Sequence, residues 1–257
     1  MLYIATHKKT GLPPMPGTAI VQAGAAGREP LPYLSDATGD NISSKNAYFC
    51  ELTVLYWVWK NTDDDFKGLA HYRRLFGRSN LSGSLSSSYT EPELEALLAG
   101  ADIVLPYTEY LLQDARAELC NGCCRPDVYA RMREVVAEVS PDYLQSFDSV
   151  FDSNELTLFN MMFCRRELFD SYCKWLFAIL FTLEKDVDMT GYSPYERRLY
   201  GFLSERLLNV WVRHNNLVVV HTAVTQTEMP LLERLSLVRR RLTNRNRFWL
   251  RSKASGR

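Results

Sequence analysis

The clearest structural signal in the chain is the stretch Gly68-Leu69-Ala70-His71-Tyr72-Arg73-Arg74. Its apolar first half indicates a buried strand, which we predict over residues 66–74. Its second half places a histidine and two arginines where that strand ends. Open α/β sheets bind their ligands outside the carboxyl ends of their strands. The stretch therefore predicts both a buried strand and a ligand-binding edge.

Similar apolar runs recur on both sides of this strand. We predict further strands or extended runs over residues 3–7, 20–22, 101–106, 156–164 and 217–221. Amphipathic spacing predicts helices over residues 45–60, 92–98, 168–185 and 194–214, and an interrupted helical region over residues 115–150. Strands that alternate with helices are typical of the α/β class. We therefore predict a domain with a mostly parallel sheet flanked by helices.

The composition of the chain is that of a globular protein without a net charge. Of its 257 residues, 46% are apolar and 23% are charged, and 30 lysines and arginines balance 30 aspartates and glutamates. A nucleic-acid binder usually carries a basic surplus, so we expect no nucleic-acid partner. The first residues lack the pattern of a secretory signal. The longest apolar run, residues 175–183, is shorter than the about 20 residues that a membrane-spanning helix needs, so we expect a cytoplasmic protein.

The C-terminal tail, residues 226–257, differs from the rest of the chain in its charge. No acidic residue follows Glu233. The basic residues after that point are Arg234, Arg239, Arg240, Arg241, Arg245, Arg247, Arg251, Lys253 and Arg257. The apolar residues between them include Leu235, Leu237, Val238, Leu242, Phe248, Trp249 and Leu250. A basic amphipathic segment suits an anionic membrane surface and predicts a peripheral position on the inner face of the cell membrane. A solvated C-terminal helix is the alternative.

Two adjacent arginines, Arg73 and Arg74, suggest a clamp for a diphosphate. Guanidinium groups bind phosphate in a bidentate way and keep their charge at every working pH. A basic surface pair at a strand exit is the alternative.

Asp40, which precedes a helix, is placed either to bond ribose or sugar hydroxyls or to serve the turn before that helix.

Glu205 and Arg206 stand among apolar residues of the predicted helix over residues 194–214. A carboxylate in such surroundings has a raised pKa and can act as a general base. A buried structural ion pair is the alternative.

The cysteines contain one metal-like spacing, Cys120-x-x-Cys123-Cys124. A structural zinc site needs a second pair of ligands downstream, which the sequence lacks, so we predict no metal site.

Several longer motifs, in order along the chain, resemble one known family. They include Ile4-Ala5-Thr6-His7-Lys8, Thr38-Gly39-Asp40-Asn41-Ile42-Ser43-Ser44-Lys45-Asn46, the stretch from Gly68 to Arg74, Asn160-Met161 and Gly201-Phe202-Leu203-Ser204-Glu205-Arg206-Leu207. Over residues 3–222 the chain resembles the DUF4422 family of bacterial capsule and exopolysaccharide glycosyltransferases. The basic C-terminal tail lies outside this resemblance.

The resemblance implies a GT-A-like fold of the nucleotide-diphospho-sugar transferase type, in a single domain over residues 1–225. It implies a hexosyltransferase that moves a sugar, galactose by association, from a UDP donor to a glycan. That glycan would be lipid-linked, or a growing capsular polysaccharide, exopolysaccharide or lipopolysaccharide. The alternative is a non-catalytic subunit that binds glycan or nucleotide within a polysaccharide assembly complex. Many such enzymes hold Mn²⁺ or Mg²⁺ on an Asp-x-Asp motif, whereas the corresponding strand end here is His71-Tyr72-Arg73. The arginines would then replace the charge of the metal, and metal dependence stays open.

The resemblance also assigns roles to individual residues. Those assigned to the nucleotide sugar are Thr6, His7, Asp40, Asn41, Asn46, Tyr72, Arg73, Arg74 and Asn160. Within this set, Thr6 and His7 would line the pocket for the base and ribose, and Asn160 would lie near the sugar or the acceptor. Asp40, Asn41 and Asn46 would approach the ribose or the donor sugar.

The catalytic group that the resemblance implies has three members. Glu205 would be the base for the acceptor if the reaction inverts the anomeric carbon. Arg206 would orient that base or bind phosphate. His71 stands at the strand end beside the diphosphate, where fixed cations stabilise the charge of the leaving group most.

Overall fold

The computed structural model describes residues 1–254, together with the side chains of residues 1–247. The side chains of Phe248, Trp249, Leu250, Arg251 and Lys253, and all of Arg257, lie outside the described part of the predicted basic tail.

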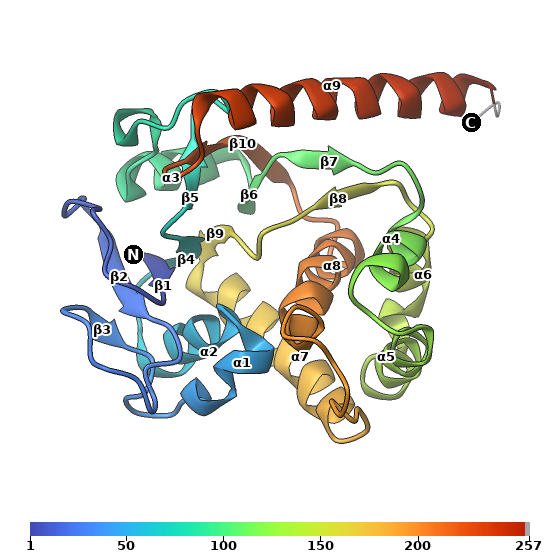
Figure 1. The fold of residues 1–257 in the computed structure, drawn as a ribbon, viewed down its shortest axis with the longest axis horizontal. Helices are drawn as coiled ribbons and strands as arrows, with labels where there is room; N and C mark the ends of the chain where they lie inside the picture. The colour runs from blue at the N-terminus through green and yellow to red at the C-terminus, as the bar shows by residue number, and fades with distance from the viewer. Residues whose placement is uncertain (255–257) are drawn as a thin grey trace.

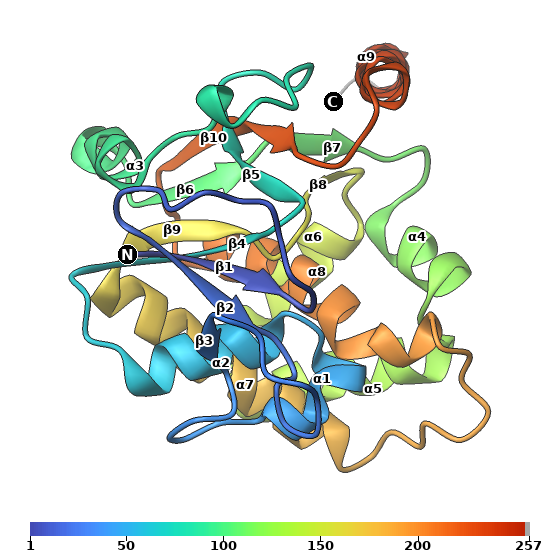
Figure 2. The ribbon, with the colours of Figure 1, turned by 60° about the vertical axis from the view of Figure 1, so that its left-hand side comes forward.

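A large mixed sheet forms the centre of the molecule (Figure 1, Figure 2). Its order is β3-β2-β1-β4-β5-β10-β6-β9, and β9 also pairs with β4, so the last five strands close into a small barrel. The strands are β1 (Leu2–Thr6), β2 (Thr18–Gln22), β3 (Leu34–Ser35), β4 (Phe66–His71), β5 (Arg74–Gly77), β6 (Ile103–Pro106), β9 (Met162–Arg165) and β10 (Val219–Gln226). A separate antiparallel pair consists of β7 (Thr108–Tyr110) and β8 (Glu155–Thr157).

The α/β class is confirmed, but the prediction of a mostly parallel sheet is wrong for half of the strand pairs. Strands β3, β2, β1 and β4 run parallel, as do β10 and β6. Strand β5 is antiparallel to β4 and β10, and β9 is antiparallel to β4 and β6. The predicted strand over residues 66–74 is in fact a tight hairpin, because the chain reverses at Tyr72 and Arg73 and pairs His71 with Arg74.

The predicted extended run over residues 156–164 is also interrupted. It divides into β8 and β9 at Phe159 and Asn160, whose φ angles of 84° and 51° lie in the left-handed region. Residues other than glycine seldom adopt such angles, and a phenylalanine there is a conformational outlier.

The helices are α1 (Asn46–Phe49), α2 (Leu52–Asn61), α3 (Glu91–Leu97), α4 (Ala115–Gly122), α5 (Pro126–Val139), α6 (Leu144–Phe151), α7 (Arg166–Glu184), α8 (Leu199–His214) and α9 (Leu231–Ala254). The predicted helix over residues 45–60 is two helices, because Cys50 has a φ angle of 50° and separates α1 from α2. The predicted start of α8 at residue 194 is too early, since a 3₁₀ turn over Glu196–Arg198 precedes it.

Strand β1 is buried along its whole length because both faces of the sheet are covered. Tyr3 and Ala5 face the larger core beside α2, α7 and α8, whereas Leu2 and Ile4 face a smaller core beside α3. Figure 2 shows α2 and α7 on one side of the sheet and α3 and α9 on the other. With both faces packed, the carboxyl ends of β1, β2 and β4 are the part of these strands that remains open to a ligand.

Helix α9 lies across the top of the molecule above β7 (Figure 1). Its inner side carries the half-buried Leu237, Val238, Arg241 and Asn244. The Arg241 guanidinium lies 3.1 Å from the centroid of the Tyr107 ring, and its Nε lies 3.5 Å from a Glu109 carboxylate oxygen. The described part of the predicted C-terminal tail is therefore a helix that packs on the body of the protein. Within residues 1–254, no helix has both the length and the apolar character needed to cross a membrane.

Candidate functional site

A polar pocket of about 360 Å³ lies at the carboxyl ends of β1, β2 and β4, and we call it the strand-end pocket. Its lining comprises Ala5, Thr6, His7, Ala23, Arg28, Asn46, Ala47, Cys50, Glu51, His71, Arg73 and Arg198. The parallel register of the three strands brings their ends to one edge of the sheet, as expected for an α/β ligand site.

The strand-end pocket carries an excess of positive charge. Three arginines, Arg28, Arg73 and Arg198, line it with a single carboxylate, Glu51. None of these arginines forms an ion pair with a carboxylate within the described residues. Fixed guanidinium groups of this kind form bidentate, charge-assisted hydrogen bonds with phosphate.

His71 remains neutral between these cations. Burial, followed by the charges of Arg73 and Arg74, lowers the pKa of His71 to about 3. Its Nδ1 accepts a hydrogen bond from the Arg73 backbone N–H at 3.3 Å, so the single ring proton resides on Nε2. His71 is therefore able to donate a hydrogen bond to a ligand oxygen, but at neutral pH its protonation state makes it a donor rather than a proton carrier.

Hydrogen bonds hold several of the side chains that line the strand-end pocket in place. The Asn46 side chain accepts a hydrogen bond from Arg28 at 3.1 Å and donates one to the Cys50 carbonyl at 2.7 Å. Buried Asn160 donates to a Glu51 carboxylate oxygen and to the Gly201 carbonyl, both at 2.9 Å. The break between α1 and α2 at Cys50 thus presents Glu51 to the pocket, and the strained turn at Asn160 holds it there.

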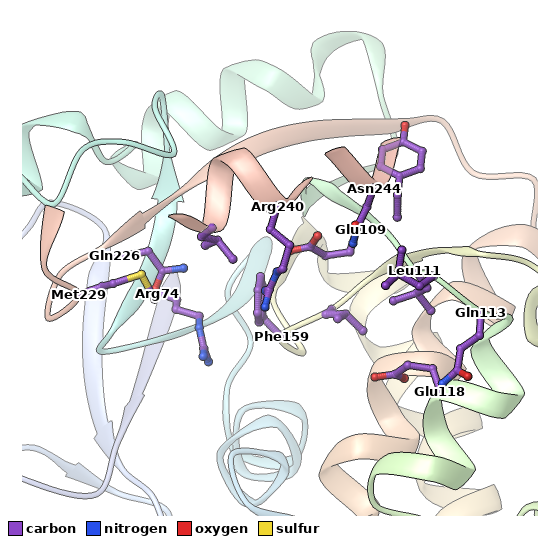
Figure 3. Close-up of a pocket in the computed structure, with 14 residues that line it drawn as sticks. Arg74, Glu109, Leu111, Gln113, Glu118, Phe159, Gln226, Met229, Arg240 and Asn244 are labelled. Carbon is purple, nitrogen blue, oxygen red and sulfur yellow. The ribbon is translucent and has the colours of Figure 1, made fainter. Parts of the chain in front are cut away.

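A larger pocket of about 690 Å³ lies under α9, and we call it the roof pocket (Figure 3). Its lining comprises Arg74, Glu109, Tyr110, Leu111, Leu112, Gln113, Glu118, Leu158, Phe159, Gln226, Met229, Leu237, Arg240 and Asn244. Arg74 connects the two sites: it lines the roof pocket, and its charge acts on His71 of the strand-end pocket. The Arg74 guanidinium lies 4.6 Å from the centroid of the Phe159 ring.

A buried arginine holds two carboxylates beside the roof pocket. Arg206 forms ion pairs with Glu205, at 2.8 Å, and with Glu118. Glu205 also accepts a hydrogen bond from the Phe159 backbone N–H at 2.9 Å, so both of its oxygens have partners. Burial raises the pKa of Glu205, while the charge of Arg206 opposes that shift.

The residues that the sequence singled out divide into three groups. Those that line the strand-end pocket are Thr6, His7, Asn46, His71 and Arg73. Tyr72, whose ring meets His7 edge-on, and Asn160, which bonds to Glu51, lie next to that pocket, whereas Arg74 lines the roof pocket and Glu205 and Arg206 lie beside the roof pocket. Asp40 and Asn41 line neither pocket: the Asp40 carboxylate accepts a hydrogen bond from the Tyr56 hydroxyl at 3.1 Å, and the Asn41 side chain accepts one from the Ser43 N–H at 3.2 Å. Both therefore hold the turn before α1.

Sequence reasoning missed Arg28, Glu51 and Arg198. Arg198 belongs to the adjacent pair Arg197-Arg198, which is the same signal that pointed to Arg73 and Arg74. Glu51 stands beside the helix break at Cys50, which amphipathic spacing does not show. The position of Arg28 depends on the loop after β2, where Gly24 has a φ angle of 62° and its N–H bonds to buried Asp36 at 2.7 Å.

The cysteine spacing does not build a metal centre in the described part of the chain. No group of three or more His, Cys, Asp or Glu side chains among these residues is arranged to hold a metal ion. Cys123 is buried, and burial raises the pKa of its thiol to about 11, which keeps it protonated.

The depressed pKa of His71 leads to a testable dependence of stability on pH. The folded-state pKa of about 3 lies below the unfolded value near 6.5, so the unfolded chain binds the extra proton first. The contribution of His71 to the free energy of unfolding should therefore fall as the pH drops from about 6.5 toward 3. In the variant His71→Asn, whose side-chain oxygen can still accept the Arg73 N–H, urea unfolding should show a shallower loss of stability over this range. Parallel curves for the two proteins would contradict the assignment.

Two comparisons with known proteins found a similarity to this chain. A family model described as "Domain of unknown function (DUF4422)" matches residues 1–216. The apo structure of the WbbM bifunctional glycosyltransferase resembles the chain with a TM-score of 0.79 at 26% sequence identity. The similarity covers 89% of this chain and 45% of the WbbM chain, so this chain spans a little under half the length of that protein. No curated protein matches the chain.

Proposed function

We propose that this chain, which belongs to the DUF4422 family, is a glycosyltransferase that moves a sugar from a nucleoside diphosphate to a glycan. The observation that carries the proposal is the basic strand-end pocket at the carboxyl ends of parallel strands. The similarity to WbbM, a bifunctional glycosyltransferase, supports the reaction class.

The mechanism follows from the charges around the pocket. Arg28, Arg73 and Arg198 provide guanidinium groups that bind the two phosphates, and the Nε2–H of His71 donates a further hydrogen bond. When the bond between the anomeric carbon and the phosphate oxygen breaks, negative charge grows on the diphosphate. Cations already fixed around that charge lower the barrier without any reorganisation.

A divalent metal is not part of this mechanism, because the donor set does not fit one. Mg²⁺ in phosphate-binding sites is usually held by carboxylates together with the phosphates. The strand-end pocket offers a single carboxylate, Glu51, and one of its oxygens already accepts a hydrogen bond from Asn160. No step of the proposed reaction therefore involves a metal ion.

The finer identity of the substrates rests on the family resemblance. We propose UDP as the nucleotide, a hexose such as galactose as the sugar, and a lipid-linked or growing cell-surface glycan as the acceptor. A cytoplasmic protein that meets such an acceptor needs to approach the membrane surface. The exposed Leu235 and Leu242 of α9, together with Arg239 and Arg245, support a peripheral contact with anionic lipid.

A non-catalytic subunit that binds nucleotide or glycan is the second candidate. The single carboxylate in the strand-end pocket favours it, because many related enzymes use a pair. The two candidates differ in turnover, since a binding subunit would take up nucleotide and release no product.

Calorimetric titration with UDP, GDP and dTDP, together with an assay for UDP release from UDP-hexoses, tests the proposal. We expect one nucleoside diphosphate to bind and its sugar derivative to be hydrolysed slowly or transferred. Binding without turnover of any derivative would favour the subunit, and no binding of any nucleotide would refute both the transferase and a nucleotide-binding subunit.

A further inference from the structure

We infer that the roof pocket is the acceptor subsite, that it takes a hexose with an apolar portion attached, and that Glu118 accepts the proton of the attacking hydroxyl. The inference rests on the proposed function, because it places the acceptor beside a donor bound in the strand-end pocket. It also gives α9, which lies outside the matched residues 1–216, a part in acceptor binding.

The two pockets share no lining residue, but Arg74 and the strained turn of Phe159 and Asn160 link them. Asn160 bonds to Glu51 on the strand-end side, while Phe159 lines the roof pocket. Figure 3 shows Arg74 and Glu118 on either side of Phe159. A donor whose diphosphate lies against the arginines would therefore direct its sugar toward the side that Glu118 faces. Backbone strain of this kind persists where the surrounding structure enforces it, and such places are often functional.

The lining of the roof pocket matches the chemistry of a sugar joined to an apolar group. Gln113, Gln226 and Asn244 offer amide donors and acceptors for hydroxyl groups, and the Phe159 ring offers a flat face. Met229 and Leu237 form an apolar part of the wall. A pocket with a few convergent polar groups and apolar walls is the usual form of a small-ligand site.

Glu118 is better placed than Glu205 to act on the acceptor. Glu205 has both oxygens bonded, its side chain is only 16% exposed, and it lines neither pocket. Glu118 lines the roof pocket, is 36% exposed, and uses only Oε2 for its ion pair with Arg206. Because the Arg206 guanidinium pairs with both carboxylates, the three side chains together carry a net negative charge. Glu118 can therefore accept a proton. Arg206 is thus a positioning residue for Glu118.

The proposed step conserves atoms and charge. The acceptor hydroxyl gives its proton to Glu118, and its oxygen forms a new bond to the anomeric carbon of the donor sugar. The bond from that carbon to the phosphate oxygen breaks, and its electron pair leaves with the nucleoside diphosphate. Glu118 then returns its proton to solvent. Attack from the side opposite the diphosphate inverts the anomeric carbon.

The first arm of the test measures UDP release from the UDP-hexose that the wild-type protein hydrolyses, with water in place of the acceptor. In Glu118→Gln we expect the rate to fall at least 100-fold, in the range that removal of a general base usually causes. UDP affinity should stay within twofold. The matched control Glu134→Gln, on the surface of α5, should keep the wild-type rate. A rate within threefold of wild type in Glu118→Gln, or an equal loss of UDP affinity, would overturn the inference. A wild-type protein that binds no nucleotide would refute the proposed function instead.

The second arm does not depend on the stability of a Glu118 variant. Saturation-transfer NMR with octyl β-glucoside and octyl β-galactoside should show contact between these probes and the wild-type protein. The variant Leu237→Trp places a much larger side chain in the wall of the roof pocket and should weaken this signal while leaving UDP binding intact. The control Ser236→Trp, on the exposed side of the same helix, should keep the signal. The absence of a signal in the wild type, or equal signals in the two variants, would show that the roof pocket does not take this class of ligand.

Discussion

Replacing Arg73 with alanine is expected to weaken UDP binding about 10- to 100-fold. A hydrogen bond to a charged group contributes about 1.5–3 kcal/mol, and each 1.4 kcal/mol corresponds to a tenfold change in affinity. Transfer of the sugar should fall further, because the lost cation also stabilises the charge that develops on the leaving diphosphate. The fold should be unaffected, since Arg73 is exposed and forms no ion pair with a carboxylate within the described residues.

The adjacent arginines 197 and 198 provide a matched control for this experiment. Arg198 lines the strand-end pocket and Arg197 does not, although both are exposed and belong to the same 3₁₀ turn. Arg198→Ala should weaken UDP binding to a degree similar to Arg73→Ala, whereas Arg197→Ala should change it less than twofold. Calorimetry on the three variants, with thermal melts to check folding, measures both effects. Equal affinities in all three would mean that the diphosphate binds elsewhere.

The open edge of the sheet could be predicted from the sequence because local signals specify it. Apolar runs that end in Thr6-His7 and in His71 indicate buried strands and polar strand ends, and the structure brings these residues into one pocket. The reversal at Tyr72 and Arg73 could not be predicted in the same way. The turn contains neither glycine nor proline, and the apolar pattern continues through Leu75 and Phe76, so periodicity indicates a single strand.

The complete charge of the pocket depends on contacts between distant parts of the chain. Arg28, Glu51 and Arg198 reach the pocket from a loop, a helix break and a 3₁₀ turn, and no spacing rule connects these positions. Asp40 shows why position along the chain does not settle a residue's role. Its place before a helix is compatible with a turn and with a sugar ligand, and in the structure its carboxylate accepts a hydrogen bond from Tyr56. Only the packing of α2 against this turn distinguishes a ligand-binding role of Asp40 from a role in the turn.

Replacing Arg206 with methionine is expected to destabilise the protein by about 3–5 kcal/mol. Arg206 is 3% exposed, and its removal leaves Glu205 in an apolar setting without its counter-charge. Breaking a buried ion pair from one side has an effect of this size. The matched control is Arg133→Met: Arg133 also pairs with a carboxylate, that of Asp148 at 2.6 Å, but both side chains are about 40% exposed. An exposed pair of this kind contributes about 0–1 kcal/mol.

The same variant should also change how stability depends on pH, which separates lost charge pairing from lost packing. Without Arg206, the folded-state pKa of Glu205 rises further above its unfolded value, because burial already raises it and the opposing charge is gone. A carboxyl whose folded pKa is raised contributes stability below its unfolded pKa and loses that stability as the pH rises through the folded pKa. Arg206→Met should therefore be closest to the wild type in acid and furthest from it above neutral pH. The double variant Arg206→Met with Glu205→Gln should recover part of the loss at pH 8. Urea unfolding at pH 5 and pH 8 measures both effects, and a loss that is equal at the two pH values and unchanged in the double variant would assign the role of Arg206 to packing alone.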